Sequence, residues 1–153
     1  MRFLLLVAAA GASAACSGLA GDRAIVSSDF DKEASASDLR YREDAARTGL
    51  RRLEASLADY YKAEKRIPAR IELLVPKYLA EVPVLNLPAC GRERDDVEMY
   101  PADVLRAGQV DGSRIKGTGR WGYVYNDRQV IVFVDCTHKT SRSRAWYQER
   151  GVF

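Results

Sequence analysis

The chain has 153 residues, of which 47% are hydrophobic and 29% are charged, and its formal net charge at neutral pH is +3. This length suits one domain with its own core, and the composition excludes a chain that is disordered throughout. The net charge is too small to indicate, by itself, a nucleic-acid or membrane-surface partner.

Residues 1–15 have the pattern of an export signal. Arg2 gives a positive start, residues 3–10 are apolar, and residues 11–15 are small, which is the order of segments in a secretory signal. The apolar run is too short to span a bilayer. Two processing routes stay open, because the small residues suit a general signal peptidase while residues 13–16 resemble the lipoprotein box of bacteria. In the box, Ser13 stands where leucine is usual.

The cysteine count favours the lipoprotein route. Three cysteines in an oxidising compartment leave one thiol unpaired, and a lipid on Cys16 would remove that thiol. Cys90 and Cys136 are then predicted to form a disulfide, worth about 3–4 kcal/mol in the chain-entropy model. We therefore expect a lipid anchor at Cys16 and a location in the bacterial periplasm or on the outer surface. The alternative is simple secretion with Cys16 free.

One long helix is predicted after a tether. Residues 16–37 have no sustained apolar period and are expected to form a flexible tether, so that the domain covers residues 38–153. A helix is predicted over residues 38–64, with Ser37 or Asp38 as its N-cap. Glu43 and Arg47 belong to its charged face, which is expected to be solvated. The apolar stripe recurs at spacings of three and four residues: Ala46, Leu50, Leu53, Leu57 and Tyr60/Tyr61.

The middle of the chain is predicted to consist of connectors. Residues 71–79 are expected to form a short helix or turn that packs on the sheet, and residues 89–119 a long surface excursion. Asp95, Asp96 and Glu98 in this excursion have oxygen ligands that would suit a hard cation. Their spacing is not that of a regular calcium loop, so a hydrated acidic loop is expected and no metal site is predicted.

The last third changes its period from that of a helix to that of strands. Residues 121–125 alternate, residues 126–128 supply a turn, and residues 130–134 are β-branched and aromatic, which predicts a hairpin. A third short strand is expected at residues 145–147. The helix has one apolar stripe and the sheet one apolar face, and each needs the other to bury it. The predicted fold class is α+β, with one long helix packed on a small antiparallel sheet.

The domain resembles the globular head of type IV pilins and of the pseudopilins of type II secretion systems, over residues 38–147. The resemblance rests on four short segments, in this order: Tyr60-Tyr61 ahead of Ile67-Pro68, Tyr78-Leu79-Ala80-Glu81-Val82-Pro83, Gly119-Arg120-Trp121-Gly122-Tyr123, and Val134-Asp135-Cys136-Thr137-His138. It implies a structural or protein-binding role in an apparatus of this kind, with other pilin-like or secretion-apparatus proteins as partners.

Two features depart from that family. Residues 1–37 contain no basic leader cut at a glycine and no apolar polymerisation helix behind it, so assembly into a filament by the usual route is not expected. Major pseudopilins often bind calcium through aspartates in the loop after the last strands, whereas residues 137–144 are basic here. The resemblance therefore implies no calcium site in this chain.

The residues give little sign of catalysis. His138 is the only histidine and lies two residues from Cys136, which raises a cysteine–histidine nucleophile as a hypothesis. A disulfide to Cys90 is the better use of Cys136, and the sequence shows no third orienting group. It also shows no zinc-ligand spacing, no phosphate loop and no nucleophile elbow. We expect a protein that is not an enzyme and has no cofactor, metal or small-molecule substrate.

A basic and aromatic C-terminal face is the candidate binding site. Basic groups interleaved with aromatic rings can hold a polyanion by charge and stacking. The alternative function is thus a periplasmic binding module for DNA or an acidic envelope polymer, with DNA the less favoured of the two. The competing interpretation is that the rings pack the sheet and the cations lie over them in solvent. The candidate residues are Arg120, Trp121, Tyr123, Lys139, Arg142, Arg144 and Trp146.

Overall fold

The computed structural model describes residues 20–126 and 128–152, with side chains described for residues 28–126 and 128–149. The chain forms two units, which divide between Ser35 and Ala36. This boundary lies close to the predicted start of the domain at residue 38. Cys16 and the predicted export signal lie outside the described residues.

The first unit contains the beginning of helix α1, which spans Ala20–Glu64. In this part of the helix Lys32 and Asp29 form an exposed ion pair at 3.5 Å, and the Ser35 hydroxyl donates to the Asp31 carbonyl at 2.8 Å. Residues 20–37 thus belong to a helix, where a flexible tether without regular structure was expected. An exposed helix needs no apolar period, and this stretch contains several alanines and no proline.

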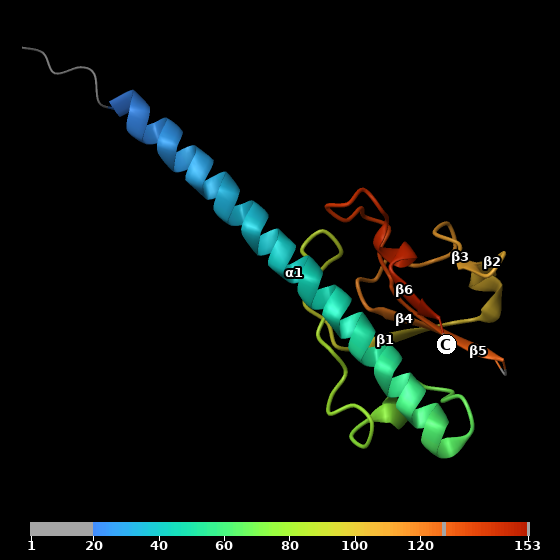
Figure 1. Ribbon diagram of the computed structural model, residues 1–153. Helices are drawn as coiled ribbons and strands as arrows, with labels where there is room; N and C mark the ends of the chain where they lie inside the picture. Colours follow the sequence, from blue (N-terminus) through green and yellow to red (C-terminus); the bar gives the residue numbers. More distant parts are fainter. Residues whose placement is uncertain (1–19, 127, 153) are drawn as a thin grey trace, which may run out of the picture. The chain divides into compact units, whose positions relative to one another are not determined.

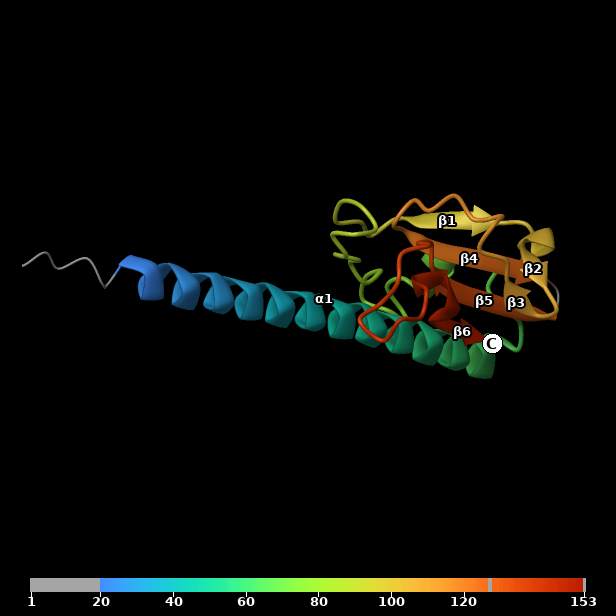
Figure 2. The ribbon, with the colours of Figure 1, turned by 90° about the horizontal axis from the view of Figure 1, so that it is seen from above.

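In the second unit α1 packs one apolar stripe against a sheet (Figure 1, Figure 2). The predicted stripe is buried, namely Ala46, Leu50, Leu53, Leu57 and Tyr60. The helix ends at Glu64 as predicted, where Lys65 adopts a left-handed φ of 55° and donates its N–H to the Tyr61 carbonyl at 2.9 Å. None of the described helices is both long and apolar enough to cross a membrane.

The sheet has four strands in the order β1-β4-β5-β6, and the α+β class is confirmed (Figure 2). Strands β4 (Trp121–Asn126) and β5 (Gln129–Val134) form the predicted hairpin, and β6 (Arg150–Val152) pairs antiparallel with β5. Strand β1 (Val97–Tyr100) runs parallel to β4, so the sheet is mixed. The third strand predicted at residues 145–147 begins instead at Arg150, and a 3₁₀ turn, η3 (Trp146–Gln148), occupies most of that place.

Both faces of the sheet are buried, although one apolar face was predicted. One face carries Trp121, Tyr123 and Val132 against α1, and the other carries Val124, Ile131 and Phe133 in a second cluster. The second face is covered by residues from the segment predicted to be a surface excursion. This segment forms β1, a 3₁₀ turn η2 (Ala102–Val104), and a small hairpin of β2 (Leu105–Arg106) and β3 (Gln109–Val110).

The predictions for residues 71–79 and for the disulfide are also confirmed. Residues 71–79 contain a 3₁₀ turn, η1 (Ile71–Leu74), whose Ile71 and Leu74 are fully buried, as expected for a segment that packs into the core. Cys90 and Cys136 form the predicted disulfide, with Cα atoms 5.5 Å apart. The bond joins the end of the 84–90 segment to the residue two places after β5.

Candidate functional site

The candidate C-terminal face does not present its aromatic rings to solvent. Trp121 and Tyr123 are 0% exposed and Trp146 is 2% exposed. The Trp121 Nε1–H donates to the Pro83 carbonyl at 2.6 Å, and the Tyr123 hydroxyl donates to the Pro68 carbonyl at 2.6 Å. Burial also raises the pKa of Tyr123. The prediction that these three rings line a binding face is therefore wrong. The rings are buried in the same hydrophobic core as the apolar stripe of α1.

The cations of that candidate face lie in two places, on the residue before β4 and on the loop after β5. Arg120 pairs through Nε with Asp96 at 2.8 Å and through Nη1 with Glu98 at 3.0 Å, and Glu98 also holds Lys116. Asp96 and Glu98, whose oxygens would suit a hard cation, are thus paired with arginine and lysine side chains. The remaining cations lie exposed on the loop after β5: Lys139, Arg142 and Arg144.

A buried ionic network fastens that loop to α1. Glu43 accepts the Ser141 N–H at 2.7 Å and the Ser141 hydroxyl at 2.5 Å, and it pairs with Arg47 at 3.2 Å. Arg47 also lies 5.3 Å from the centre of the Trp146 ring. Glu43 is 2% exposed, so the expectation that these two helix charges are solvated is wrong. Glu43 lies three residues before Ala46 on the apolar stripe, and that spacing could have revealed its burial.

Replacing Glu43 with glutamine is expected to lower the free energy of unfolding by about 1–3 kcal/mol at pH 7. Burial disfavours the charged form of Glu43, but the Ser141 hydrogen bonds and Arg47 outweigh it, so the pKa lies below its ordinary value. A lowered folded-state pKa stabilises the fold above about pH 4.3, and this contribution is lost as the pH falls through the lowered value.

Urea unfolding from pH 7 down to pH 2 measures this effect of the Glu43→Gln substitution. The difference between wild type and variant should shrink as the pH falls below about 4. Asp44→Asn is the matched control, because Asp44 also pairs with Arg47 but is exposed. A difference for Glu43→Gln that is the same at every pH would contradict the ionic role of Glu43.

A second buried carboxylate shapes the loop before β4. Asp135 is 0% exposed and accepts the N–H groups of Gly117 and Thr118, both at 2.9 Å, as well as the Thr118 hydroxyl. Its neighbour Cys136 is held in the disulfide and is 1% exposed, while His138 is exposed on the loop. Cys136 therefore has no free thiol for a cysteine–histidine nucleophile in this structure. Within residues 28–126 and 128–149, no group of three metal-ligating side chains could hold an ion.

Exposed apolar residues gather where residues 84–89 run beside α1. One groove of about 190 Å³ is lined by Tyr41, Ala45 and Val84, and another of about 260 Å³ by Leu39, Pro88 and Ala89 among others. Tyr41 is 76% exposed and Val84 48%. Arg42 and Asn86 also line the first groove, where Arg42 donates to the Asn86 side chain at 2.6 Å. We call the exposed residues Leu39, Tyr41, Val84, Pro88 and Ala89 the α1–loop surface.

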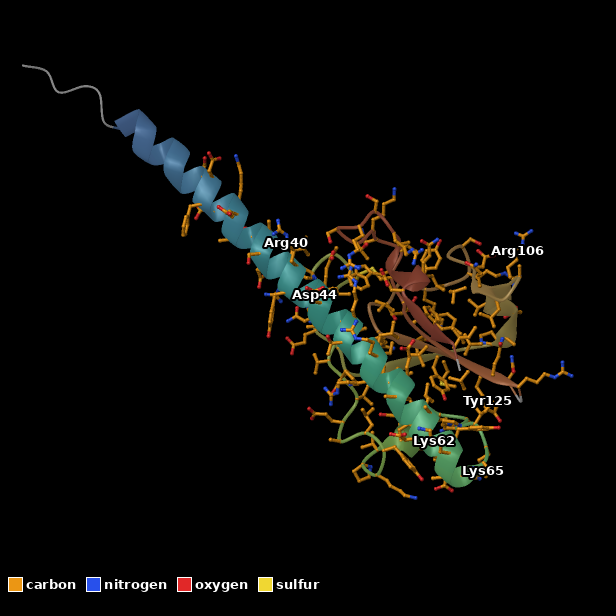
Figure 3. The ribbon with its side chains drawn as sticks, viewed as in Figure 1. Arg40, Asp44, Lys62, Lys65, Arg106 and Tyr125 are labelled. Carbon is orange, nitrogen blue, oxygen red and sulfur yellow. A yellow bond between two sulfur atoms is a disulfide. The ribbon has the colours of Figure 1, made fainter. Side chains whose placement is uncertain are left out.

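Charged side chains border the α1–loop surface. Arg40 and Asp44 are exposed on the same stretch of α1 (Figure 3). Arg42 pairs with Asp38 at 2.7 Å, and this contact raises the pKa of Arg42. An apolar centre with a charged border is the anatomy of a protein–protein interface. No sequence pattern predicted this surface, because residues 84–89 are brought to α1 only by the tertiary fold.

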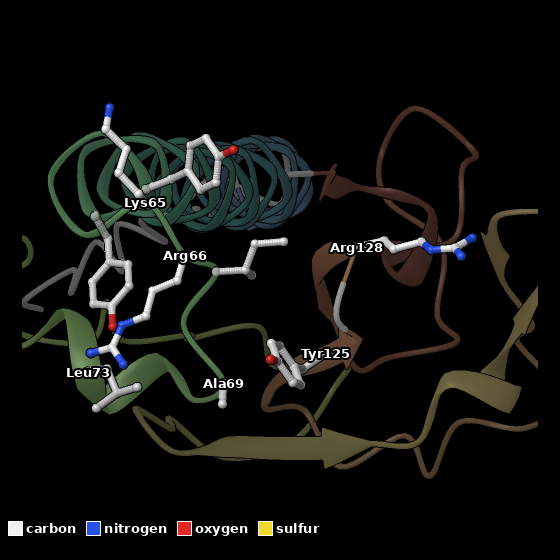
Figure 4. A pocket seen from close by; sticks show the side chains of 9 residues that line it. Lys65, Arg66, Ala69, Leu73, Tyr125 and Arg128 are labelled. Atoms are coloured by element: carbon white, nitrogen blue, oxygen red, sulfur yellow. The ribbon is translucent and has the colours of Figure 1, made fainter.

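A third hollow lies at the C-terminal end of α1 and has a volume of about 530 Å³. We call it the tyrosine cleft. Arg66 extends along its wall toward Leu73, and Tyr125 lies across from them (Figure 4). None of its residues was a candidate from the sequence, because three separate segments form it. The cleft is lined by Tyr60, Tyr61, Lys65, Arg66, Ile67, Ala69, Leu73, Tyr125 and Arg128.

Comparison of the chain with protein-family models, with curated proteins and with solved structures finds no match.

Proposed function

We propose that the chain is an exported, non-enzymatic envelope protein whose pilin-like domain binds protein subunits of a type II secretion or type IV pilus-like apparatus. In this proposal the export signal covers residues 1–15, and a lipid on Cys16 holds the domain at a membrane. The choice of this apparatus rests on the resemblance of the sequence to the heads of type IV pilins and pseudopilins and on the α+β fold class. It is therefore an argument by analogy.

The observation that carries the proposal is the α1–loop surface. Tyr41 is a large aromatic residue that is 76% exposed beside exposed Val84, with a groove between the helix and the loop. Exposed aromatic residues in a partly hollowed surface are the usual anchors of protein interfaces. A subunit with an apolar helix face fits such a surface, because an apolar ridge fills a groove between a helix and a loop.

The other proposed role, a polyanion-binding module at the C-terminal face, has less support. Stacking on bases requires exposed aromatic faces, and Trp121, Tyr123 and Trp146 are buried. Arg120 is already paired with Asp96 and Glu98. The exposed cations Lys139, Arg142 and Arg144 remain on the loop, where a mobile anionic polymer would find charge but no stacking surface.

The test is photo-crosslinking in living cells from a photoreactive phenylalanine analogue placed at Tyr41. Because Tyr41 is exposed, the substitution leaves the core intact. The expected result is a crosslink to a pilin-like or secretion-apparatus subunit. The matched control is the same analogue at Arg106, which is exposed on the β2–β3 hairpin away from α1 (Figure 3). It should give no crosslink to that subunit.

A further inference from the structure

The tyrosine cleft has the size and construction of a ligand site. Its volume of about 530 Å³ falls within the range of about 300–1,000 Å³ that ligand pockets occupy. Its walls come from the end of α1, from the turn that leads into η1, and from the hairpin of β4 and β5. The shape of the cleft therefore depends on the folded domain and not on one loop.

The cleft is lined by positively charged side chains, and no lining carboxylate neutralises them. No aspartate or glutamate lines it. Lys65, Arg66 and Arg128 are exposed, and none of them forms a salt bridge with another residue in the described part of the chain. Lys65 and Arg128 point outward from the rim, whereas Arg66 follows the wall (Figure 4). An anion in the cleft would meet Arg66 first and the other two cations at the edge.

Glu64 at the end of α1 is the carboxylate that would compete for these cations. It accepts the Tyr78 hydroxyl at 2.7 Å and pairs with Lys77 at 3.1 Å. These two contacts, with Tyr78 as the larger, hold the pKa of Glu64 below its ordinary value, and Arg66 makes the smallest contribution. Glu64 is therefore engaged by Tyr78 and Lys77, and it forms no salt bridge with Arg66 in the described part of the chain.

The apolar part of the cleft is also open to a ligand. Tyr61 is 46% exposed and Leu73 is 50% exposed, while Ile67 and Tyr125 are half-buried. Tyr60 is 4% exposed and forms part of the core beneath. A ligand would thus bury the exposed parts of the Tyr61 and Leu73 side chains.

We propose that the tyrosine cleft binds an acidic peptide segment, which places a carboxylate on Arg66 and an aromatic or large aliphatic side chain against Tyr61 and Leu73. The planar guanidinium matches a carboxylate with two parallel hydrogen bonds. Lys65 and Arg128 attract the acidic segment toward the rim. The apolar side chain next to the carboxylate supplies the buried area.

A single-stranded nucleic acid fits the cleft less well. Such ligands need a basic track with successive exposed rings, whereas Tyr60 is buried, Tyr125 is half-buried and only Tyr61 of the three lining tyrosines is exposed. The cleft is also separate from the α1–loop surface. Tyr41 and Tyr61 lie 20 residues apart on α1, which is about 30 Å along a helix. The proposed peptide site is therefore a second site, which does not depend on the partner at Tyr41.

The test is fluorescence anisotropy with the purified full-length chain in its oxidised form. The probe is a short labelled peptide with two glutamates flanking a tryptophan, compared with its glutamine analogue and with an analogue that has alanine for tryptophan. Binding of the parent peptide should be at least about tenfold tighter than that of either analogue. Arg66→Gln should weaken the parent peptide by at least about tenfold, and Arg106→Gln, an exposed arginine outside the cleft, should leave it unchanged.

A second variant tests whether the weaker binding of Arg66→Gln comes from the cleft itself and not from an indirect change in the fold. Leu73→Glu places a negative charge on the exposed wall and should also weaken the acidic peptide, and thermal unfolding should show both variants folded. Three outcomes would overturn the proposal: no binding of the parent peptide, equal weakening by Arg66→Gln and Arg106→Gln, or preference for a single-stranded oligonucleotide over the peptide. None of these outcomes bears on crosslinking at Tyr41.

Discussion

Replacing Trp121 with alanine is expected to lower the free energy of unfolding by about 3–5 kcal/mol. Trp121 is 0% exposed and lies beneath α1, where a Cβ at Gly49 would come within 3.1 Å of its ring. The substitution removes one of the two tryptophans buried in the core that contains the α1 stripe, and it leaves a cavity under the helix. It also leaves the Pro83 carbonyl without the indole donor at 2.6 Å, which adds the cost of an unsatisfied buried group.

Urea or thermal unfolding of the full chain measures this loss. Trp121→Phe is the matched variant, because it keeps an aromatic ring and removes the indole N–H, and it should cost less than the alanine substitution. Met99→Ala, on a side chain that is 44% exposed, should have little effect. If Trp121→Ala left stability unchanged, the ring would belong to a binding surface and the packing of α1 on β4 would be wrong.

Removing the disulfide by the double substitution Cys90→Ala and Cys136→Ala is expected to cost about 4 kcal/mol, the value that the chain-entropy model gives for a loop of this length. The two cysteines are 46 residues apart in the sequence. The unfolded chain therefore gains much conformational freedom when the bond is absent. Both positions are buried or nearly so, so the alanines also lose packing.

Chemical unfolding with and without a reductant checks the disulfide prediction. The wild type should lose about as much stability on reduction as the double variant loses by substitution. Cys16→Ala is the control and should leave the unfolding of the second unit unchanged, because position 16 lies outside that unit. Alkylation of both Cys90 and Cys136 in the denatured, unreduced protein would contradict the bond.

Local patterns predicted the parts of the fold that depend on near neighbours. The stripe from Ala46 to Tyr60 predicted the buried face of α1 and its end at Glu64. The alternation in residues 121–125 and the turn at Asn126 predicted the hairpin of β4 and β5. In that turn the Asn126 side chain accepts the N–H groups of Arg128 and Gln129, which is the ordinary use of asparagine in turns.

Contacts between distant segments were not predictable from the same patterns. Strand β1 has only four residues and follows two aspartates in the sequence, so its local pattern is not that of a strand. Its parallel pairing with β4 also depends on the path of the chain through residues 101–120. The same segment covers the second face of the sheet, which one apolar period could not reveal. The start of α1 was missed because an exposed helical segment leaves no apolar pattern.

The candidate site was predicted in the wrong place for a related reason. Alternation indicates that Trp121 and Tyr123 share a face of β4, but it does not indicate whether a helix or solvent covers that face. The structure places α1 there. The α1–loop surface and the tyrosine cleft each combine α1 with residues more than forty positions away, and no motif marks such a combination.

Identification of the proteins crosslinked to position 41 in living cells tests the proposed function most directly. The predicted result is one dominant crosslink at Tyr41 to a pilin-like or secretion-apparatus subunit, which is absent from position 106 and is lost when Val84 is replaced by aspartate. The Val84 substitution lies in the same groove, so it should remove the contact without unfolding the domain. Identical crosslinks from positions 41 and 106, or none from position 41, would contradict the proposal that this surface binds an apparatus subunit.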